Sequence, residues 1–246
     1  MIIGVVIPAY NEEQYLRDCL DSINIAIEQI ALHQKLIQTK NLQIPLSSKK
    51  EAQPEKKIDI EVHVLVVLDT CDDDSLSIAK NSTADYLECK VNCVGIARDL
   101  GVRQLIAEGA HWIACTDADS TVDALWLVEQ IRAQPTDVIC GVVDVDRWDT
   151  LSEKTKHEYT SKYQDCMNHT HIHGANLSFS AAAYITSGGF QPIPCHEDVK
   201  LVEQMQAINL NIMWTNRVRV TTSSRLDARA PEGFAYFLRA IEFNQI

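Results

Sequence analysis

The stretch VHVLVVLD, residues 62–69, is an almost unbroken apolar run that ends in an acid. A short run of this kind without polar alternation predicts a strand that is buried on both faces. The stretch IIGVVI, residues 2–7, has the same character, and Pro8 closes it as a turn would. Strands covered on both faces are typical of a parallel sheet with helices on each side. The two stretches therefore predict an α/β fold.

Helical periodicity follows the first strand. Leu16, Leu20, Ile23, Ile27 and Ile30 recur at spacings of three and four, which predicts one apolar helix face. Strand-like and helix-like segments keep alternating, as expected of a sheet flanked by helices in a single domain, residues 1–246. The other expected helices are 97–108, 122–133, 153–167, 197–208 and 234–241, and the other expected strands are 112–116, 138–145, 176–180, 212–215 and 217–221.

Residues 33–57 interrupt this pattern. They are polar, contain six of the twelve lysines, and include Pro45 and Pro54. We interpret them as an exposed polar insertion or mobile loop. A solvated loop and a basic arm that recruits an acidic partner both remain open for this segment.

Charge and apolar run length exclude several classes of protein. The net charge is −12, from 34 acidic and 22 basic residues, which argues against a nucleic-acid partner. The longest purely apolar runs are far shorter than the roughly 20 residues of a membrane helix. No basic segment precedes residues 2–7, so no secretion signal is expected. Eight cysteines without a CxxC pair suggest reduced thiols, and we expect a soluble cytoplasmic protein.

Polar side chains gather where the expected strands end. Residues 8–12 follow the first strand, Asp69 follows the second, and Asp117 and Asp119 follow the strand at 112–116. In open α/β sheets this edge holds the ligand site. No glycine-rich phosphate loop is present. Carboxylates repel phosphates unless a divalent cation lies between them, and two aspartates suit Mg²⁺ or Mn²⁺.

Several motifs occur in a fixed order: PAYNEE at 8–13, VLD at 67–69, ARDLG at 97–101, DAD at 117–119, GGF at 188–190 and ED at 197–198. In order and spacing the set resembles the family 2 glycosyltransferases of the GT-A fold. The resemblance covers the chain apart from 33–57. It looks most like small soluble bacterial members with the segments HIHGANL, here 171–177, and SR followed by RAPEGF, here 224–225 and 229–234.

The resemblance implies a Rossmann-like, mostly parallel twisted sheet in which residues 1–119 bind a nucleoside-diphosphate sugar and 120–246 form the acceptor half. Asp69 matches the acid that binds the base, and Arg98 matches the arginine that helps to hold the nucleotide. Of the Asp-x-Asp pair, Asp119 would ligate a bridging Mn²⁺ or Mg²⁺, and Asp117 would lie at the ribose or the metal. The loop along base and ribose would include Pro8, Ala9, Tyr10 and Glu12.

On the acceptor side, Asp198 matches the general base that removes the proton of an attacking hydroxyl. His173 either lines the pocket or is a packing histidine, while Arg225 and Arg229 either close over the diphosphate or form ion pairs. The expected acceptor is a small molecule, a lipid-linked molecule or a glycan, and a homodimer is left open. The pocket for sugar and acceptor is expected to include His173, Gly174, Asn176, His196, Glu197, Arg225 and Arg229.

Three features depart from the pattern or compete with it. Asp99 replaces the asparagine that usually follows the arginine of the nucleotide site. The loop after Asp69 lacks the usual glycine, and its acids 72–74 either cap the next helix or add metal or ribose contacts. Cys166, His169, His171 and His173 form a cluster that offers a second, zinc-binding interpretation.

The expected activity is that of a metal-dependent, hexosyltransferase-type glycosyltransferase that inverts configuration with Asp198 as base. Three alternatives remain: a retaining transferase, a sugar-phosphate nucleotidyltransferase, and a degenerate nucleotide-sugar-binding module without activity.

Overall fold

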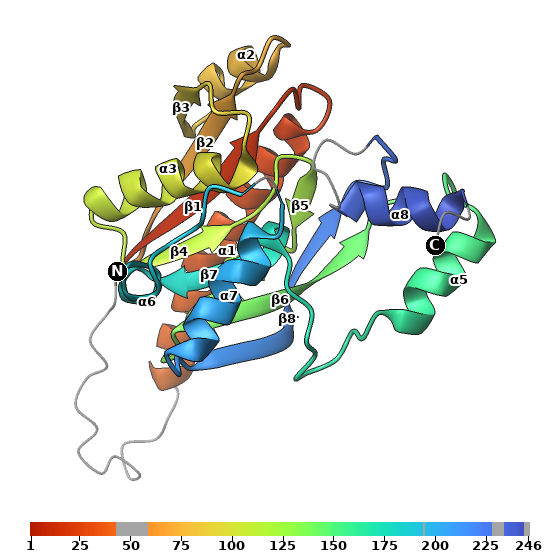
Figure 1. Ribbon diagram of the computed structural model, residues 1–246. Coiled ribbons are helices and arrows are strands. Elements are labelled where there is room, and N and C mark those ends of the chain that lie inside the picture. Colours follow the sequence, from red (N-terminus) through yellow and green to blue (C-terminus); the bar gives the residue numbers. More distant parts are fainter. Residues whose placement is uncertain (43–58, 194, 228–233, 244–246) are drawn as a thin grey trace.

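A computed structural model describes residues 1–42, 59–193, 195–227 and 234–243. Its centre is one eight-stranded sheet in the order β3-β2-β1-β4-β7-β6-β8-β5 (Figure 1). The strands are β1 (Ile2–Ala9), β2 (Glu61–Asp69), β3 (Asp85–Cys89), β4 (Trp112–Cys115), β5 (Ser120–Val122), β6 (Val138–Val145), β7 (Leu177–Ser180) and β8 (Ile212–Thr222).

The sheet is mostly parallel, as expected. The strands β3, β2, β1 and β4 pair in parallel, and so do β6 and β8. Only β7, between β4 and β6, and β5, at the edge beside β8, run the other way. The parallel register brings the carboxyl ends of β1, β2 and β4 to one edge, because Val5 lies opposite both Val64 and Ala114.

A helical layer covers each face of the sheet. Ile3, Val5 and Ile7 are fully buried on one face of β1, and Val6 is fully buried on the other. The first face packs against α1 (Leu16–Leu42), α2 (Ser75–Lys80) and α4 (Trp126–Arg132). The second packs against α3 (Val94–Ala107), α6 (Ala181–Ser187) and α7 (Glu197–Ala207). Burial of each such aliphatic side chain contributes about 1.5–3 kcal/mol, so the two-faced apolar strands stabilise the α/β fold.

A smaller apolar cluster lies at one end of the sheet. There α5 (Glu153–Lys162) and α8 (Phe234–Glu242) lie side by side, apart from the other helices (Figure 1). Val145, Leu151, Tyr159 and Leu238 form its buried centre. This cluster supplies one wall of the cavity described below.

The structure corrects several expected boundaries. The first helix continues through Leu42, so residues 33–42 of the expected insertion are helical, and residues 43–58 lie outside the described part of the chain. The segment 122–133 is divided between β5 and α4, and the helix expected to reach residue 167 ends at Lys162. The two expected strands at 212–221 are one. The sequence reading missed β3 and α6.

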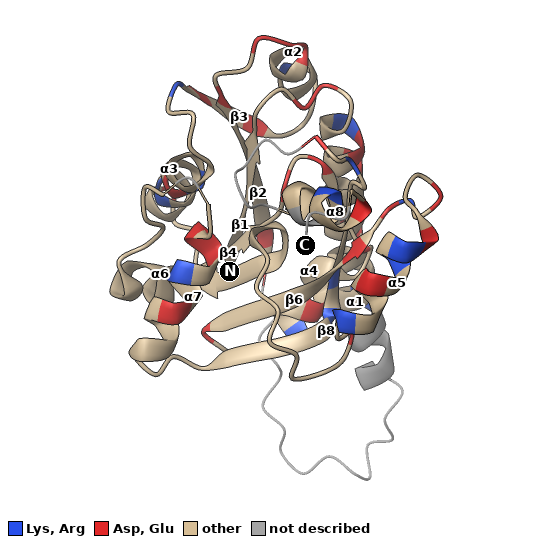
Figure 2. Ribbon diagram, turned by 45° about the vertical axis from the view of Figure 1, so that its right-hand side comes forward, with Lys and Arg blue, Asp and Glu red and all other residues tan. Residues whose placement is uncertain are grey.

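Acidic residues gather in particular places on the ribbon. Figure 2 shows a run of them in the loop that leads into α2, where Asp72, Asp73 and Asp74 follow one another. Within the described residues, no helix is long and apolar enough to cross a bilayer.

Candidate active site

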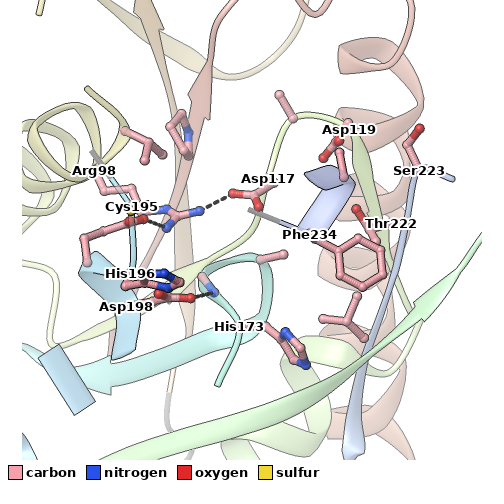
Figure 3. Close-up of a pocket in the computed structure, with 18 of the residues that line it drawn as sticks. Arg98, Asp117, Asp119, His173, Cys195, His196, Asp198, Thr222, Ser223 and Phe234 are labelled. Carbon is pink, nitrogen blue, oxygen red and sulfur yellow. Dashed lines mark hydrogen bonds and ion pairs between the residues drawn. The ribbon is translucent and has the colours of Figure 1, made fainter. Parts of the chain in front are cut away.

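A cavity of about 840 Å³ opens at the carboxyl edge of the sheet, between the ends of β1, β2 and β4, the start of α7, and α5 with α8 (Figure 3). It brings together most of the residues singled out in the sequence. Those that line it are Pro8, Ala9, Tyr10, Glu12, Asp69, Arg98, Asp117, Asp119, His173, Gly174, His196, Glu197, Asp198 and Arg225. Arg229 lies outside the described residues.

A buried arginine joins the two halves of this cavity. Arg98, on α3, is only 3% exposed and pairs with Asp117 at the end of β4 and with Glu197 at the start of α7 (Figure 3). Burial opposes the charge of Arg98, but the two carboxylates outweigh it and raise its pKa. For Glu197, burial outweighs the arginine and raises the pKa. A buried charge without a partner is strongly destabilising. Removing one partner from a buried ion pair costs on the order of 3–5 kcal/mol of stability, so Arg98 requires its carboxylates.

A second arginine lies over the other aspartate. The Nη1 and Nη2 atoms of Arg225 donate to the two carboxylate oxygens of Glu12 at 2.8 and 2.9 Å, and Nη2 lies 2.9 Å from Asp119 Oδ2. The sequence left two roles open for Arg225, closure over the diphosphate and an ion pair. In the structure Arg225 forms ion pairs, and both of its partners, Glu12 and Asp119, line the cavity. Burial raises the pKa of Asp119 to about 6; Arg225 opposes this rise, and Asp117 and Glu12 add to it.

Asp69 organises the loop in front of α3. One of its carboxylate oxygens accepts the N–H groups of Val91 and Asn92 at 2.8 and 3.0 Å, and the other accepts that of Cys93 at 3.0 Å. Burial alone would raise the pKa of Asp69, but these bonds lower it below the ordinary value. Asp69 therefore shapes the cavity wall, a role that its place at the end of β2 did not reveal.

The expected base stands at the first turn of α7. His196 precedes the helix in the left-handed region, with φ of 60°, and the chain then turns the next two acids in different directions. Both acids line the cavity, but Glu197 is paired with Arg98, whereas Asp198 is bound by backbone N–H groups. Asp198 Oδ2 accepts the backbone N–H of Gly174 at 2.6 Å, and Oδ1 accepts that of Val199 at 2.8 Å. The carboxylate is thus held in one orientation.

Aromatic rings form the wall that α5 and α8 supply. Tyr159 and Tyr163 stack with centroids 4.9 Å apart, and Tyr163 stacks on His171 at 4.2 Å. The Tyr163 hydroxyl lies 3.1 Å from His173 Nε2. Burial lowers the pKa of His173 to about 3, with smaller effects from His171 and His169, so the imidazole is neutral near pH 7. The sequence reading missed both tyrosines, although their spacing of four places them on one face of a helix.

Asn176 does not line the cavity. It is 1% exposed, and its Nδ2 donates to the carbonyls of Val142 on β6 and Val218 on β8, at 2.7 and 2.9 Å. Its Oδ1 accepts the indole N–H of Trp126 at 2.9 Å. The side chain therefore joins two strands instead of contacting a ligand.

The departures from the family pattern also have structural partners. Asp99 accepts the hydroxyl of Tyr184 at 2.6 Å and the Nε–H of Arg103 at 2.7 Å, which joins α3 to α6. Asp73 accepts the backbone N–H groups of Glu13 and Ser75, both at 2.9 Å. It therefore joins the loop after β1 to the start of α2, whereas Asp74, the residue at the N-cap of α2, makes no side-chain capping bond.

The described residues contain no group of three or more His, Cys, Asp or Glu side chains arranged to hold a metal ion, so the structure does not support a zinc site at Cys166, His169, His171 and His173. Asp117 and Asp119 form a smaller set of hard oxygen donors. The cavity is rich in acids: Glu12, Asp69, Asp117, Asp119, Glu197 and Asp198 line it, against Arg98, Lys162 and Arg225. A divalent cation with its remaining ligands from diphosphate and water fits this donor set and charge.

Comparison with known proteins agrees with the fold. The family model for glycosyl transferase family 2 matches residues 52–187, more than half of the chain. Similar solved structures include S. aureus TarS 1–349 in complex with UDP-GlcNAc, with a TM-score of 0.65 and 13% identity over 95% of this chain and 62% of that one. Another is the mannosyltransferase PcManGT from Pyrobaculum calidifontis in complex with GDP-Man and Mn²⁺, with a TM-score of 0.57 and 16% identity over 99% of this chain and 62% of that one.

The chain thus spans about 62% of the length of these two structures, and the low identities establish the fold alone. No curated protein matches the sequence significantly. The family match covers Asp69 at the end of β2, Arg98 on α3, and Asp117 and Asp119 between β4 and β5. The chain belongs to glycosyl transferase family 2.

Proposed function

We propose that this protein transfers a sugar from a nucleoside-diphosphate sugar to a hydroxyl group of an acceptor, with a divalent cation and with inversion at the anomeric carbon. One observation carries the proposal: a single cavity contains Asp117 and Asp119 from the end of β4 and, at the start of α7, Asp198. The first pair suits a diphosphate with its cation, and the third carboxylate suits a proton acceptor.

The donor nucleotide would lie along Pro8, Ala9 and Tyr10, with Asp69 and Arg98 beside it. The excess of carboxylates in this cavity would repel a diphosphate. Mn²⁺ or Mg²⁺ held by Asp117 and Asp119 would remove that repulsion and stabilise the negative charge that develops on the departing diphosphate. Arg225, which lies against Asp119, is a second positive group within the same part of the cavity.

The acceptor hydroxyl would lose its proton to Asp198 as its oxygen forms the new bond to the anomeric carbon and the diphosphate leaves. The hydrogen bond from Gly174 N–H fixes one oxygen of Asp198 and so orients the carboxylate. A carboxylate on the face opposite the leaving group gives inversion. In a retaining enzyme, Asp198 would orient the acceptor instead. The eight free cysteines support a reducing compartment, and we place the reaction in the cytoplasm.

The direct test is turnover of a panel of UDP-, GDP- and dTDP-sugars with Mn²⁺, with Mg²⁺, and with EDTA. We expect hydrolysis or transfer for at least one donor with a cation and loss of turnover with EDTA. Binding without turnover would favour a non-catalytic nucleotide-sugar module. The configuration of the product, measured by NMR, separates inversion from retention.

A further inference from the structure

The cavity wall built by α5, α8 and residues 171–173 has features that the donor site does not require. We call Tyr159, Tyr163, His171, His173 and Phe234 the aromatic wall; all five line the cavity. His173 and Phe234 lie to one side of the cavity, and Arg98 and Asp198 lie to the other (Figure 3). Asp119 lies on the same side of this view as Phe234, so the aromatic wall shares the cavity both with the groups that would hold the diphosphate and with the proposed base.

The hydrogen bonds around Tyr163 favour one tautomer of His173. The backbone N–H of Val143 donates to the Tyr163 hydroxyl oxygen at 2.7 Å, so the hydroxyl hydrogen points elsewhere. The partner in its reach is His173 Nε2, at 3.1 Å. If Nε2 carried the hydrogen instead, the Tyr163 oxygen would accept two bonds, and its own hydrogen would have to turn to the neighbouring Tyr159 hydroxyl, which already donates to the Val143 carbonyl. Donation from Tyr163 to Nε2 therefore favours the neutral tautomer of His173 with its hydrogen on Nδ1.

This Nδ1–H group has no partner among the described residues, and the ring lines the cavity. A histidine held by burial and hydrogen bonding in one neutral tautomer is a fixed donor, because it does not change its charge near pH 7. The aromatic wall thus presents ring carbons, which favour apolar contact, and one N–H, which favours an oxygen atom.

The charges in the cavity restrict what the aromatic wall accepts. Every described cationic side chain that lines the cavity is paired: Arg98 with Asp117 and Glu197, Arg225 with Glu12 and Asp119, and Lys162 with Glu158 at 3.0 Å. A phosphate or carboxylate at the aromatic wall would meet neutral rings and the carboxylate of Asp198. A sugar ring, with C–H groups on its faces and hydroxyl oxygens on its rim, matches a wall of rings with one donor.

We propose that the aromatic wall binds an uncharged sugar ring of the acceptor, and that His173 donates its Nδ1–H to one of the oxygens of that ring. The inference rests on the proposed function, because it takes Asp198 as the group that receives the acceptor's proton. His173 is then a residue that positions and selects the acceptor, and Tyr163 acts through it.

The first test does not depend on turnover. Nitrogen-15 NMR of the ring of His173 should show hydrogen on Nδ1 in the parent protein and a mixture of tautomers in Tyr163→Phe. Methyl glycosides of glucose, galactose and mannose should shift the His173 signals, and their 6-phosphates should do so less. A parent ring with hydrogen on Nε2, or a stronger response to the phosphates, would overturn the inference.

The second test compares transfer to a saccharide with hydrolysis of the donor by water. Tyr163→Phe and His173→Phe should raise the acceptor KM by about three- to tenfold, the effect of one lost hydrogen bond, and should lower transfer more than they lower hydrolysis of the donor by water. His173→Asn retains an N–H donor and should recover part of the loss. Tyr236→Phe, which removes an exposed hydroxyl from α8, is the matched control.

An equal loss of hydrolysis and transfer in the wall variants would overturn the acceptor assignment. A parent protein that neither binds nor hydrolyses any nucleotide sugar would overturn the proposed function instead, and the NMR experiment would still decide the tautomer and the preference for uncharged sugars.

Discussion

Gly174 lies so close to Arg98 that a Cβ atom at this position would overlap the guanidinium group. Its backbone N–H also donates to Asp198 at 2.6 Å. Because Gly174 has no side chain, both Arg98 and Asp198 can approach the turn at 174–176. Both contacts depend on the turn at 174–176, so Gly174 couples the donor half of the cavity to the acceptor half.

Gly174→Ala should therefore displace Arg98 from Asp117 and Glu197. We expect a loss of stability of about 1–3 kcal/mol, typical of overpacking, together with weaker binding of the donor nucleotide. Urea denaturation and titration with UDP in Mn²⁺ measure the two effects. Gly188→Ala is the control, because that glycine has a φ of 93° but open space around its Cβ position. It should lose stability through backbone strain and keep its affinity for UDP, and an equal loss of affinity would contradict the coupling.

The substitution Asp198→Asn tests the proposed role of this single residue as the general base. The substitution keeps the size of the side chain and removes its ability to take a proton, so transfer should fall by about 10²–10⁴-fold. Donor affinity should change little, because Asp117 and Arg98 are unaltered. Glu203→Gln, an exposed acid on the same helix paired with Lys200, is the matched control and should transfer at the parental rate. Parental transfer by Asp198→Asn would remove the base assignment and leave the retaining alternative.

At the scale of elements, Asn176 joins two paired strands at an irregularity in their pairing. The pairing of β6 and β8 shifts register between Cys140 and Val142, and the Asn176 amide bonds a carbonyl on each strand near this irregularity. Asn176→Ala would leave these carbonyls and the Trp126 N–H without partners, at a cost of about 1–3 kcal/mol. Denaturation should show this loss, while the folded variant binds UDP as the parent does. Unchanged stability with weakened UDP binding would restore Asn176 to the binding site.

A second prediction concerns the contact between α5 and α8. Glu242 on α8 accepts hydrogen bonds from Thr155 Oγ1 and from the Ser152 N–H and Oγ at the start of α5. The bond from Thr155 contributes most to lowering the pKa of Glu242, and the bonds to Ser152 follow. Because the folded-state pKa lies below the ordinary 4.5, the stabilisation is present above pH 4.5 and is lost as the pH falls through the folded value. Parent and Glu242→Gln should differ in thermal midpoint at pH 7, and the difference should shrink as the pH falls below 4.5; a constant difference would contradict this account.

The elements that could be predicted from the sequence are those in which the order of apolar and polar residues shows directly which faces are buried. The strands β1 and β2 were identifiable because both of their faces are apolar. The edge strand β3 was missed because it reads DYLEC, with exposed acids at Asp85 and Glu88. The helix expected at 122–133 begins only at Trp126, because Val122 belongs to β5. The strand β5 was missed because it is defined by its pairing with β8, about a hundred residues away.

The same distinction holds for the candidate site. Asp69, Asp117 and Asp119 were identifiable because parallel strands bring their ends to one edge. The pairing of Arg225 with Glu12 spans 213 residues, and no local pattern encodes it. Tyr159 on α5 and Tyr163 directly after it were missed because the sequence does not show which face of α5 is turned toward the cavity. Chain topology decides that, and the packing of α5 against α8 fixes it.

At the scale of the whole molecule, the cavity is formed by segments from both ends of the chain, from Pro8 to Phe234. A ligand that contacts all of them binds the folded protein and not the unfolded chain. It should therefore raise the stability of the molecule as a unit, by about 2.7 kcal/mol at a ligand concentration one hundred times Kd. The acids in the cavity add a condition: UDP alone should bind weakly, because a diphosphate without a cation faces Asp117 and Asp119.

We accordingly expect UDP with Mn²⁺ to raise the thermal midpoint, and UDP with EDTA or Mn²⁺ alone to raise it much less. Asp119→Asn should abolish the joint effect of UDP and Mn²⁺, because it removes an anionic ligand and leaves Arg225 paired with Glu12 alone. Asp85→Asn, on the exposed edge strand β3, changes the net charge by the same amount and should keep the full shift. If UDP raised the midpoint equally in EDTA and in Mn²⁺, Arg225 and Arg98 would be the groups that neutralise the diphosphate, and metal dependence would be wrong.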